Sequence, residues 1–301
     1  MFSLNTFPKV SIIISTYNGI RYIGETIESV RSQTYTNWEL IIIDDGSNDN
    51  TCEVITRIKD DRIYLCKAGR IGINGRIKNI GLSKSSGELI AFIDHDDLWA
   101  PAKLEKQVAA LEQFPEAGFC LTGGYNFKDA GQPVNYFYKQ NKGISVDHIF
   151  LSFFRSEISA WTQALLVRRE CIEKAGAFNE NSLFADPEFI VNLSSHFKAV
   201  MLYEPLVYHR LHDNSYSTIK WVQCHNQGLD IIRKYKNNRL LPISVARDAL
   251  FRSHINFGEK YLFHKERRKA ILHFYEAWKN KPLSIVPFKK TAKAILYTFK
   301  K

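Results

Sequence analysis

Three apolar runs rich in β-branched residues, each ending abruptly in a polar cluster, constrain the fold of this chain more than any other feature. The runs and their clusters are Val10 to Ser15 before Thr16-Tyr17-Asn18, Glu39 to Ile43 before Asp44-Asp45-Gly46-Ser47, and Leu89 to Ile93 before Asp94-His95-Asp96-Asp97. Continuous apolar runs of this length are typical of strands covered on both faces, as in a parallel sheet.

Segments with helical spacing separate these strands. Ile23, Ile27 and Val30 recur at helical intervals after the first strand, and Asn74 to Ser85 predicts a helix before the strand at Leu89. The alternation predicts an α/β fold, with a mostly parallel central sheet and helices on both faces. Because ligands of such sheets bind beyond the C-terminal strand ends, we expect the three polar clusters to converge on one site.

The pattern changes along the second half of the chain. Gln163 to Val167, Ala199 to Tyr203 and Leu206 to His209 are predicted as short strands, and Asp186 to His196 as a helix. Beyond Ile219 the pattern is wholly helical.

The composition is that of a folded globular protein, because 45% of the 301 residues are hydrophobic and 24% are charged. The five cysteines are scattered and never form Cys-x-x-Cys, which argues against a disulfide framework and for a reducing compartment. No apolar run reaches the roughly 20 residues that span a bilayer, and the start of the chain lacks the layout of a signal peptide. These features predict a cytoplasmic protein.

The net charge of +10 is concentrated at one end of the chain. From Lys220 onward there are 19 Lys and Arg against 5 Asp and Glu, whereas the first 219 residues hold 22 against 26. The basic part therefore has different expected partners from the acidic body. An anionic membrane surface and nucleic acid are the two classes that such a charge attracts.

Near the C-terminus the sequence predicts a basic amphipathic helix. Its apolar stripe consists of Phe288, Ala292, Ile295 and Phe299. The lysines that lie largely off this stripe are Lys289, Lys290, Lys293, Lys300 and Lys301. Such a helix favours peripheral binding to the inner face of a membrane. The alternative is a helix that packs its stripe on the body and leaves the lysines in water. We do not expect nucleic acid as a partner.

The acidic cluster after the strand at Leu89 is the strongest chemical signal. Several carboxylates at one strand end repel each other unless a positive group arrives to share them. A divalent cation takes carboxylate oxygens and can carry a phosphate on its other side. The alternatives are a solvated acidic turn, or a helix start at which Asp97 is a capping residue.

Five motifs between Pro8 and Ser217 resemble those of the family 2 glycosyltransferases, the inverting nucleotide-sugar enzymes of the GT-A (Rossmann-like) fold. They are Val10 to Asn18, Ile43 to Ser47, Gly87 to Asp97, Arg168-Arg169 with Gly176 to Glu180, and Tyr208 to His212 with Ser215 and Ser217. Each motif alone is weak, but five in the family's order are specific.

The resemblance implies a nucleotide site at the ends of the first two strands. Thr16, Tyr17 and Asn18 would flank the base and ribose, and Asp45 would accept the imide N–H of uracil. That bond would favour a UDP-sugar as donor. The alternative for Asp44 and Asp45 is an Asx-type turn before a left-handed glycine.

The resemblance also implies a metal and phosphate site. Asp96 would bind Mn²⁺ or Mg²⁺ directly, with Asp94 on the ribose or the same cation, and His212 on the metal or diphosphate unless it is structural. Lys78 replaces the family's Arg and would bind phosphate as a point charge. Arg70 stands where the family commonly has Asn, and the sequence offers no account of it.

Asp186 matches the catalytic base of the family, which is the Asp of a Glu-Asp pair at a helix start. Here Ala185 replaces the Glu, and Glu188 is the alternative base. A base of this kind takes the proton of the acceptor hydroxyl as that oxygen attacks the anomeric carbon. Asp186 could instead be a helix cap with Pro187 at the first helical position.

The sequence thus predicts an inverting, metal-dependent glycosyltransferase that acts on a glycan or lipid-linked acceptor in surface polysaccharide or glycolipid synthesis. We expect a GT-A domain over residues 1–218, with a nucleotide-binding half at about 8–100 and an acceptor-side half at about 101–218. A basic helical region would follow at 219–301.

Two other enzyme classes are disfavoured, and one binding role stays open. No Gly-x-Gly-x-x-Gly follows the first strand, as a dehydrogenase would need, and Ser15 to Ile20 lacks the Gly-rich basic loop of a sugar nucleotidyltransferase. A catalytically impaired nucleotide-sugar-binding scaffold of the same fold is the alternative, motivated by Ala185 and Lys78.

Overall fold

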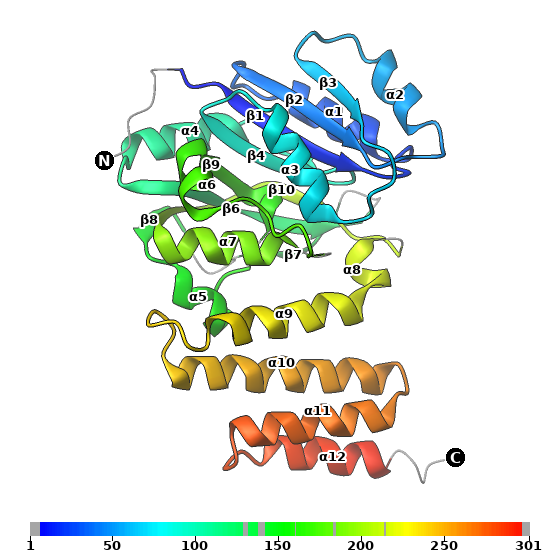
Figure 1. Ribbon diagram of the computed structural model, residues 1–301, viewed down its shortest axis with the longest axis vertical. Coiled ribbons are helices and arrows are strands. Elements are labelled where there is room, and N and C mark those ends of the chain that lie inside the picture. The colour runs from blue at the N-terminus through cyan, green and yellow to red at the C-terminus, as the bar shows by residue number, and fades with distance from the viewer. Residues whose placement is uncertain are drawn as a thin grey trace. The chain divides into compact units, whose positions relative to one another are not determined.

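The computed structural model describes residues 7–128, 132–137, 142–159, 161–182, 185–213 and 215–296. The chain forms two compact units, one of residues 1–149 and 159–219 and one of residues 150–158 and 220–301 (Figure 1). The first unit holds the sheet and the second is helical. Assignment of 150–158 to the helical unit was not predicted from the sequence.

The sheet runs in the order β3-β2-β1-β4-β9-β6-β10-β5. Its parallel half consists of β1 (Val10–Thr16), β2 (Trp38–Asp44), β3 (Ile63–Lys67) and β4 (Leu89–Asp94). The other half consists of β9 (Leu165–Arg168), β6 (Ala117–Phe127), β10 (Lys198–Arg210) and β5 (Leu98–Trp99). Within that half β6 and β10 are parallel, and β9 pairs antiparallel with both β4 and β6. Two short strands, β7 (Pro133–Tyr136) and β8 (Ile144–Asp147), pair with β6 and β10.

Helices cover both faces of this sheet, which confirms the predicted α/β fold. In front of the sheet in Figure 1 lie α3 (Asn74–Lys84), α6 (Arg169–Ala175) and α7 (Ala185–His196). The opposite face is covered by α1 (Ile23–Arg31), α2 (Thr51–Arg57) and α4 (Lys103–Gln113). Right-handed crossovers explain this division, because the chain reverses its direction across the sheet between β3 and β4.

One prediction about the strands was wrong, and one strand was not predicted at all. Ala199 to Tyr203 and Leu206 to His209 belong to one strand, β10, whose register with β6 shifts around Pro205. The prediction of two strands arose because Pro interrupts the apolar pattern and cannot donate to the ladder. Strand β6 was missed because Gly118, Gly123 and Gly124 interrupt its apolar pattern.

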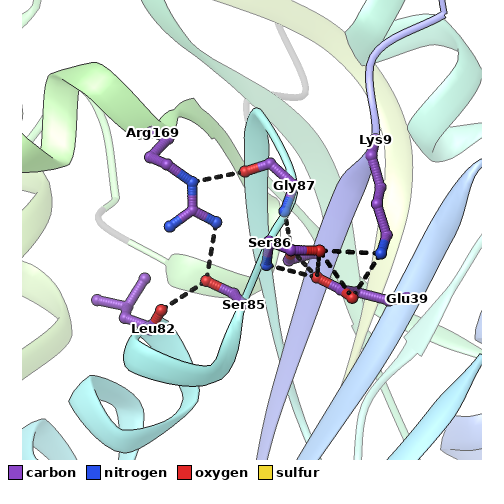
Figure 2. A network of polar contacts seen from close by, with 8 residues as sticks. Lys9, Glu39, Leu82, Ser85, Ser86, Gly87 and Arg169 are labelled. Atoms are coloured by element: carbon purple, nitrogen blue, oxygen red, sulfur yellow. Dashed lines mark hydrogen bonds and ion pairs between the residues drawn. The ribbon is translucent and has the colours of Figure 1, made fainter.

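A polar network ties the N-terminal ends of β1, β2 and β4 together (Figure 2). The buried Glu39 carboxylate accepts hydrogen bonds from Lys9 Nζ at 2.7 Å, from the Ser11 hydroxyl at 2.5 Å and from the Ser86 backbone N–H at 2.7 Å. Arg169 extends the network by donating to the carbonyl oxygen of Gly87 at 2.7 Å. This network lies at the end of the strands opposite the polar clusters, so it supports the sheet rather than a site.

The second unit is built from α5 (Phe150–Arg155), α9 (Trp221–Tyr235), α10 (Ile243–Phe263), α11 (Arg267–Asn280) and α12 (Val286–Leu296). A short helix, α8 (Tyr216–Ile219), ends the first unit. In the core of the second unit the fully buried Phe274 packs against Gly258, where a Cβ atom would collide with the ring. None of the helices in the described part of the chain is long and apolar enough to cross a membrane.

Candidate active site

The polar clusters meet at one edge of the sheet. Thr16 pairs in register with Asp44, and Ser15 pairs with Asp94 on the other side of β1. The backbone N–H of Asp45 donates to the carbonyl oxygen of Thr16 at 2.9 Å. The register therefore brings these residues together at the carboxyl ends of the parallel strands, as expected from the sequence.

Asp44 and Asn18 shape the loops of this edge. Asp44 accepts the Ser47 backbone N–H at 3.1 Å and Gly46 has φ of +75°, so Asp44 makes the turn that was its alternative reading. Asn18 also adopts a left-handed conformation, with φ of +50°. Its side-chain oxygen accepts the Asn48 N–H at 2.9 Å, which joins the loop after β1 to the loop after β2.

Arg70 contacts both Asp45 and Tyr17 at this edge of the sheet. The Asp45 carboxylate is 3% exposed and accepts backbone N–H groups from Ile71 at 2.6 Å and Gly72 at 3.0 Å. Arg70 forms an ion pair with the same carboxylate. Its guanidinium carbon lies 3.8 Å from the centroid of the Tyr17 ring.

Thr16 lies deeper in the same edge. Its side chain is 2% exposed, and its hydroxyl has no hydrogen-bond partner within the described residues. Gly19 is packed tightly here, because a Cβ atom at that position would stand 2.6 Å from the Thr16 hydroxyl and 2.7 Å from the His95 ring. The His95 ring therefore lies toward the loop after β1.

Asp96 and His212 lie side by side, although they are 116 residues apart in the chain. His212 Nε2 is 2.8 Å from Asp96 Oδ2. Burial alone would raise the pKa of Asp96, but the hydrogen bond from His212 and the charge of neighbouring histidines lower it to about 2. The Arg210 guanidinium donates to the backbone carbonyl oxygen of Asp96 at 2.9 Å. The arrangement keeps a carboxylate ionised beside an imidazole.

Lys78, Asp186 and Asp94 form a charged group between α3, α7 and β4. Lys78 Nζ lies 2.6 and 2.8 Å from the Asp186 oxygens and 3.8 Å from Asp94 Oδ1. Thr162 completes the group by donating to Asp186 Oδ2 at 2.7 Å and accepting from Lys78 at 3.1 Å. Burial alone would lower the pKa of Lys78, but Asp186 and Asp94 outweigh it and raise that pKa. Partial desolvation, opposed by Lys78 and reinforced by Asp186 and Asp96, raises the pKa of Asp94 to about 6.

Asp97 is not a helix cap, as one reading of the sequence had it. Ala102 precedes α4, while the buried Asp97 carboxylate accepts from Gln163 Nε2 and the Arg210 backbone N–H, both at 2.9 Å. Burial, with the nearby charges of Asp96 and Asp94, raises its pKa well above the usual range. Asp97, which follows β4, therefore links β10 to the short 3₁₀ turn Thr162–Ala164 that precedes β9.

Ala185 lies at the start of α7 and is fully buried. Its Cβ atom faces Gly75 of α3, where an added Cβ would stand 3.3 Å away. Glu188, the alternative base, lies on the exposed side and accepts from Asn179 Nδ2 at 3.0 Å. Asp186 is thus the carboxylate of this helix start that lies beside Lys78 and Asp94.

The roles of two residues at this site were not predicted from the sequence. Thr162 lies in a short 3₁₀ turn just before β9, where the sequence pattern carries no signal for a site. Arg70 was noticed as a departure from the family, but only the structure shows what it contacts. Within the described residues, no three His, Cys, Asp or Glu side chains are placed to hold a metal ion by themselves.

Comparisons with known proteins agree with this geometry. The chain matches the model of glycosyl transferase family 2 over residues 11–176, more than half of its length. TuaG of Bacillus subtilis, named for teichuronic acid biosynthesis, is 28% identical over 222 residues, which cover 72% of this chain and 84% of TuaG.

Two solved structures share the fold. Residues 1–349 of S. aureus TarS in complex with UDP-GlcNAc align with a TM-score of 0.68 at 16% identity, over 90% of this chain and 81% of the other. The mannosyltransferase PcManGT from Pyrobaculum calidifontis in complex with GDP-Man and Mn²⁺ aligns with a TM-score of 0.62 at 17% identity, over 100% and 84% of the two chains. The chain belongs to glycosyl transferase family 2 and is a nucleotide-sugar-dependent glycosyltransferase.

Proposed function

We propose that this enzyme transfers a sugar, with inversion, from a UDP-sugar to a hydroxyl group of a glycan or lipid-linked acceptor in surface polysaccharide or glycolipid synthesis. The observation that carries the proposal is the meeting of the Asp96–His212 pair and the Asp186–Lys78 pair at one sheet edge. Transfer needs a group that binds the donor's diphosphate, here through a metal, and a base for the acceptor's hydroxyl within one site.

The side chains of Tyr17 and Asp45 support the proposal of a nucleotide donor. An aromatic face can stack on a base, and a carboxylate can accept the imide N–H of uracil, which cytosine lacks. The TarS complex contains a UDP-sugar and the PcManGT complex a GDP-sugar. We favour UDP because a single carboxylate matches the single imide donor of uracil.

Asp96 and His212, with Asp94 nearby, fit Mn²⁺ or Mg²⁺ as part of a coordination shell. The low pKa of Asp96 keeps it ionised, and carboxylate oxygens suit both Mn²⁺ and Mg²⁺. When bound, the cation would neutralise charge that builds on the departing diphosphate. Because the described residues do not supply a complete shell, the donor's phosphates would supply the remaining ligands.

Asp186 is the proposed base. Its Oδ2 atom accepts from both Lys78 and Thr162, whereas within the described residues Oδ1 accepts only from Lys78. Oδ1 therefore retains a lone pair that can take the proton of the acceptor hydroxyl. Lys78, predicted to bind a phosphate, is fully buried and donates to Asp186 and Thr162, so we assign it the positioning of the base.

Aromatic side chains on β6, on β10 and next to Thr162 support a saccharide acceptor. Trp161 precedes Thr162, stacks on Phe137 at 4.9 Å and meets the His209 ring at 4.4 Å. Tyr125 and Tyr208 form a second stacked pair at 4.5 Å on the adjoining strands. The electron-rich faces of such rings pack well against the C–H faces of sugars.

The apolar face of α12 supports peripheral membrane binding. Phe288, Ala292 and Ile295 are exposed, and so are Lys289 and Lys293. Phe299, Lys300 and Lys301, which belong to the predicted stripe and its basic flank, lie outside the described residues. Each lysine near an anionic surface adds about 1 kcal/mol of attraction. This surface would place the enzyme at the cytoplasmic face of a membrane.

A vesicle assay tests the membrane part of the proposal. We expect co-sedimentation with vesicles that contain anionic lipid, and loss of that binding in a Phe288→Ser, Lys289→Glu, Lys293→Glu triple variant. Lys84→Glu, which removes an exposed lysine of the sheet unit, serves as the charge control. Equal binding by the triple variant would contradict the role of α12.

A donor screen tests the transferase proposal directly. Release of the nucleoside diphosphate from a panel of UDP-, GDP- and dTDP-sugars is measured with Mn²⁺, with and without membrane extracts as acceptor. We expect the unaltered protein to release UDP from a UDP-sugar, and Asp186→Asn to do so at least about 100 times more slowly. Nucleotide binding without turnover under any condition would favour a scaffold of the same fold instead.

A further inference from the structure

Arg70 fills the two positions that a base would use. Its guanidinium plane covers the Tyr17 ring, with Cζ 3.8 Å from the centroid, and its Nη1 atom pairs with Oδ2 of Asp45. Stacking on an aromatic face and donation to a carboxylate are the interactions by which Tyr17 and Asp45 would hold uracil. The guanidinium group is planar and carries N–H donors at its edge, so it resembles a nucleotide base in its stacking and in its hydrogen bonding.

The lone pairs of Asp45 show the consequence of this contact. Oδ1 accepts the N–H groups of Ile71 and Gly72, and Oδ2 accepts from Gly72 and from Arg70. Both oxygens therefore have two donors. An imide N–H can bind Oδ2 well only if the guanidinium withdraws, since the backbone donors are fixed by the loop.

The loop allows the side chain to leave while the backbone stays in place. Ile71 packs into a cluster with buried residues of β2 and α3, which anchors the chain next to Arg70. The Arg70 side chain itself is 53% exposed. A Cβ atom added at Gly69 would have no neighbour within 4 Å among the described residues, so there is space beside the loop. Rotation of the side chain into water is then the low-cost movement.

We propose that Arg70 is an intramolecular stand-in for the nucleotide base, which the incoming donor must displace, so that Arg70 weakens and thereby tunes donor affinity. This inference rests on the proposed function, in which Tyr17 and Asp45 hold the base of the donor. It also accounts for Arg70 in this chain, where the sequence comparison with the family left it unexplained.

The proposal predicts a change in UDP affinity that is opposite in sign to the change expected from simple electrostatics. Removing a cation beside an anionic ligand normally weakens binding, whereas removing a competitor strengthens it. One partly exposed ion pair and one cation–π contact together correspond to roughly a fivefold to tenfold change in affinity. We therefore expect Arg70→Ala to bind UDP roughly five to ten times more tightly than the unaltered protein.

The test is calorimetric titration of UDP, and separately of inorganic diphosphate, with Mn²⁺ present. The matched control is Arg62→Ala, because Arg62 also covers an aromatic ring, Trp38 at 3.6 Å, and pairs with an Asp at 2.8 Å, away from Tyr17 and Asp45. We expect tighter UDP binding only in Arg70→Ala, with no gain for inorganic diphosphate, which has no base.

Three results would overturn the inference. Unchanged or weaker UDP binding by Arg70→Ala would show that Arg70 does not compete with the base, and would leave the proposed function standing. An equal gain for inorganic diphosphate would show that the effect is not exerted at the base. Absence of UDP binding in both proteins would overturn the inference together with the proposed nucleotide site.

Discussion

The ammonium group of Lys78 lies 2.6 and 2.8 Å from the two carboxylate oxygens of Asp186, which joins α3 to the start of α7. Lys78 is almost completely buried, and Asp186 is 9% exposed. A buried pair of this kind fixes geometry even where its net contribution to stability is small. It therefore gives the proposed base one orientation toward Asp94, at the sheet edge that also carries Asp96.

Asp186→Asn should slow transfer strongly and keep donor binding. The amide cannot take a proton from the acceptor hydroxyl, and general base catalysis contributes typically 10²- to 10⁴-fold. We expect kcat to fall at least about 100-fold, with UDP affinity within a factor of about three. Glu188→Gln is the matched control and should stay near the original rate. A rate loss in Glu188→Gln and none in Asp186→Asn would reverse the assignment.

Lys78→Met should destabilise the fold as well as slow the reaction. It leaves the Asp186 charge in a buried position without its main partner, and such a loss costs about 3 to 5 kcal/mol. Urea unfolding followed by far-ultraviolet circular dichroism measures this change. Lys84→Met, at the exposed end of the same helix, is the control and should change stability little. Equal effects of the two substitutions would contradict the pairing.

Restoring the family's Glu at position 185 should harm this protein. Ala185 is fully buried against Gly75, so a longer acidic side chain would have to overpack the α3–α7 contact. Overpacking in a core typically costs about 1 to 3 kcal/mol. Thermal unfolding of Ala185→Glu should show a lower midpoint, whereas Ala185→Ser should stay close to the original. A rise in stability or activity would show that α7 can rearrange.

The Glu39 network predicts a pH dependence of stability away from the site. Burial alone would raise the pKa of Glu39, but its hydrogen bonds with Lys9, Ser11 and Ser86 lower it from 4.5 to about 2. Because the unfolded chain binds the proton more tightly, the network stabilises the fold above pH 4.5 and is lost as pH falls toward 2. The difference corresponds to about 3 kcal/mol at neutral pH.

Glu39→Gln measured against Glu173→Gln tests this contribution. Glu173 is exposed on α6, so its substitution should change stability little at any pH. The deficit of Glu39→Gln in the free energy of unfolding should be largest near pH 7 and should shrink between pH 4.5 and 2. A deficit that is constant with pH would contradict the role of the charge.

The fold was largely predictable because strand burial leaves a direct trace in the sequence. The apolar runs at Val10, Glu39 and Leu89 became β1, β2 and β4 within one residue at each end. The glycine-rich β6 and the Pro205 bulge of β10 were not predictable, since their pairing is fixed by neighbouring strands that lie far away in sequence. Tertiary context decides such strands more than local preference does.

The site was predictable only as a set of residue types at strand ends. The order of the motifs indicated Asp96 and His212 as candidate metal ligands, and in the structure their side chains are in contact. Nothing in the sequence showed that Lys78 would be buried on Asp186, because that contact spans 108 residues and two helices. The cation–π contact of Arg70 with Tyr17 was equally hidden, since it depends on the course of a loop.

The most direct test of the account is calorimetric titration of the purified protein with UDP, GDP and dTDP, each with Mn²⁺ and again with EDTA. The account predicts binding that prefers UDP, requires the metal and is lost in Asp96→Ala. Nucleotide binding that is indifferent to metal and to Asp96→Ala, or no binding of any nucleotide, would contradict the proposed donor site.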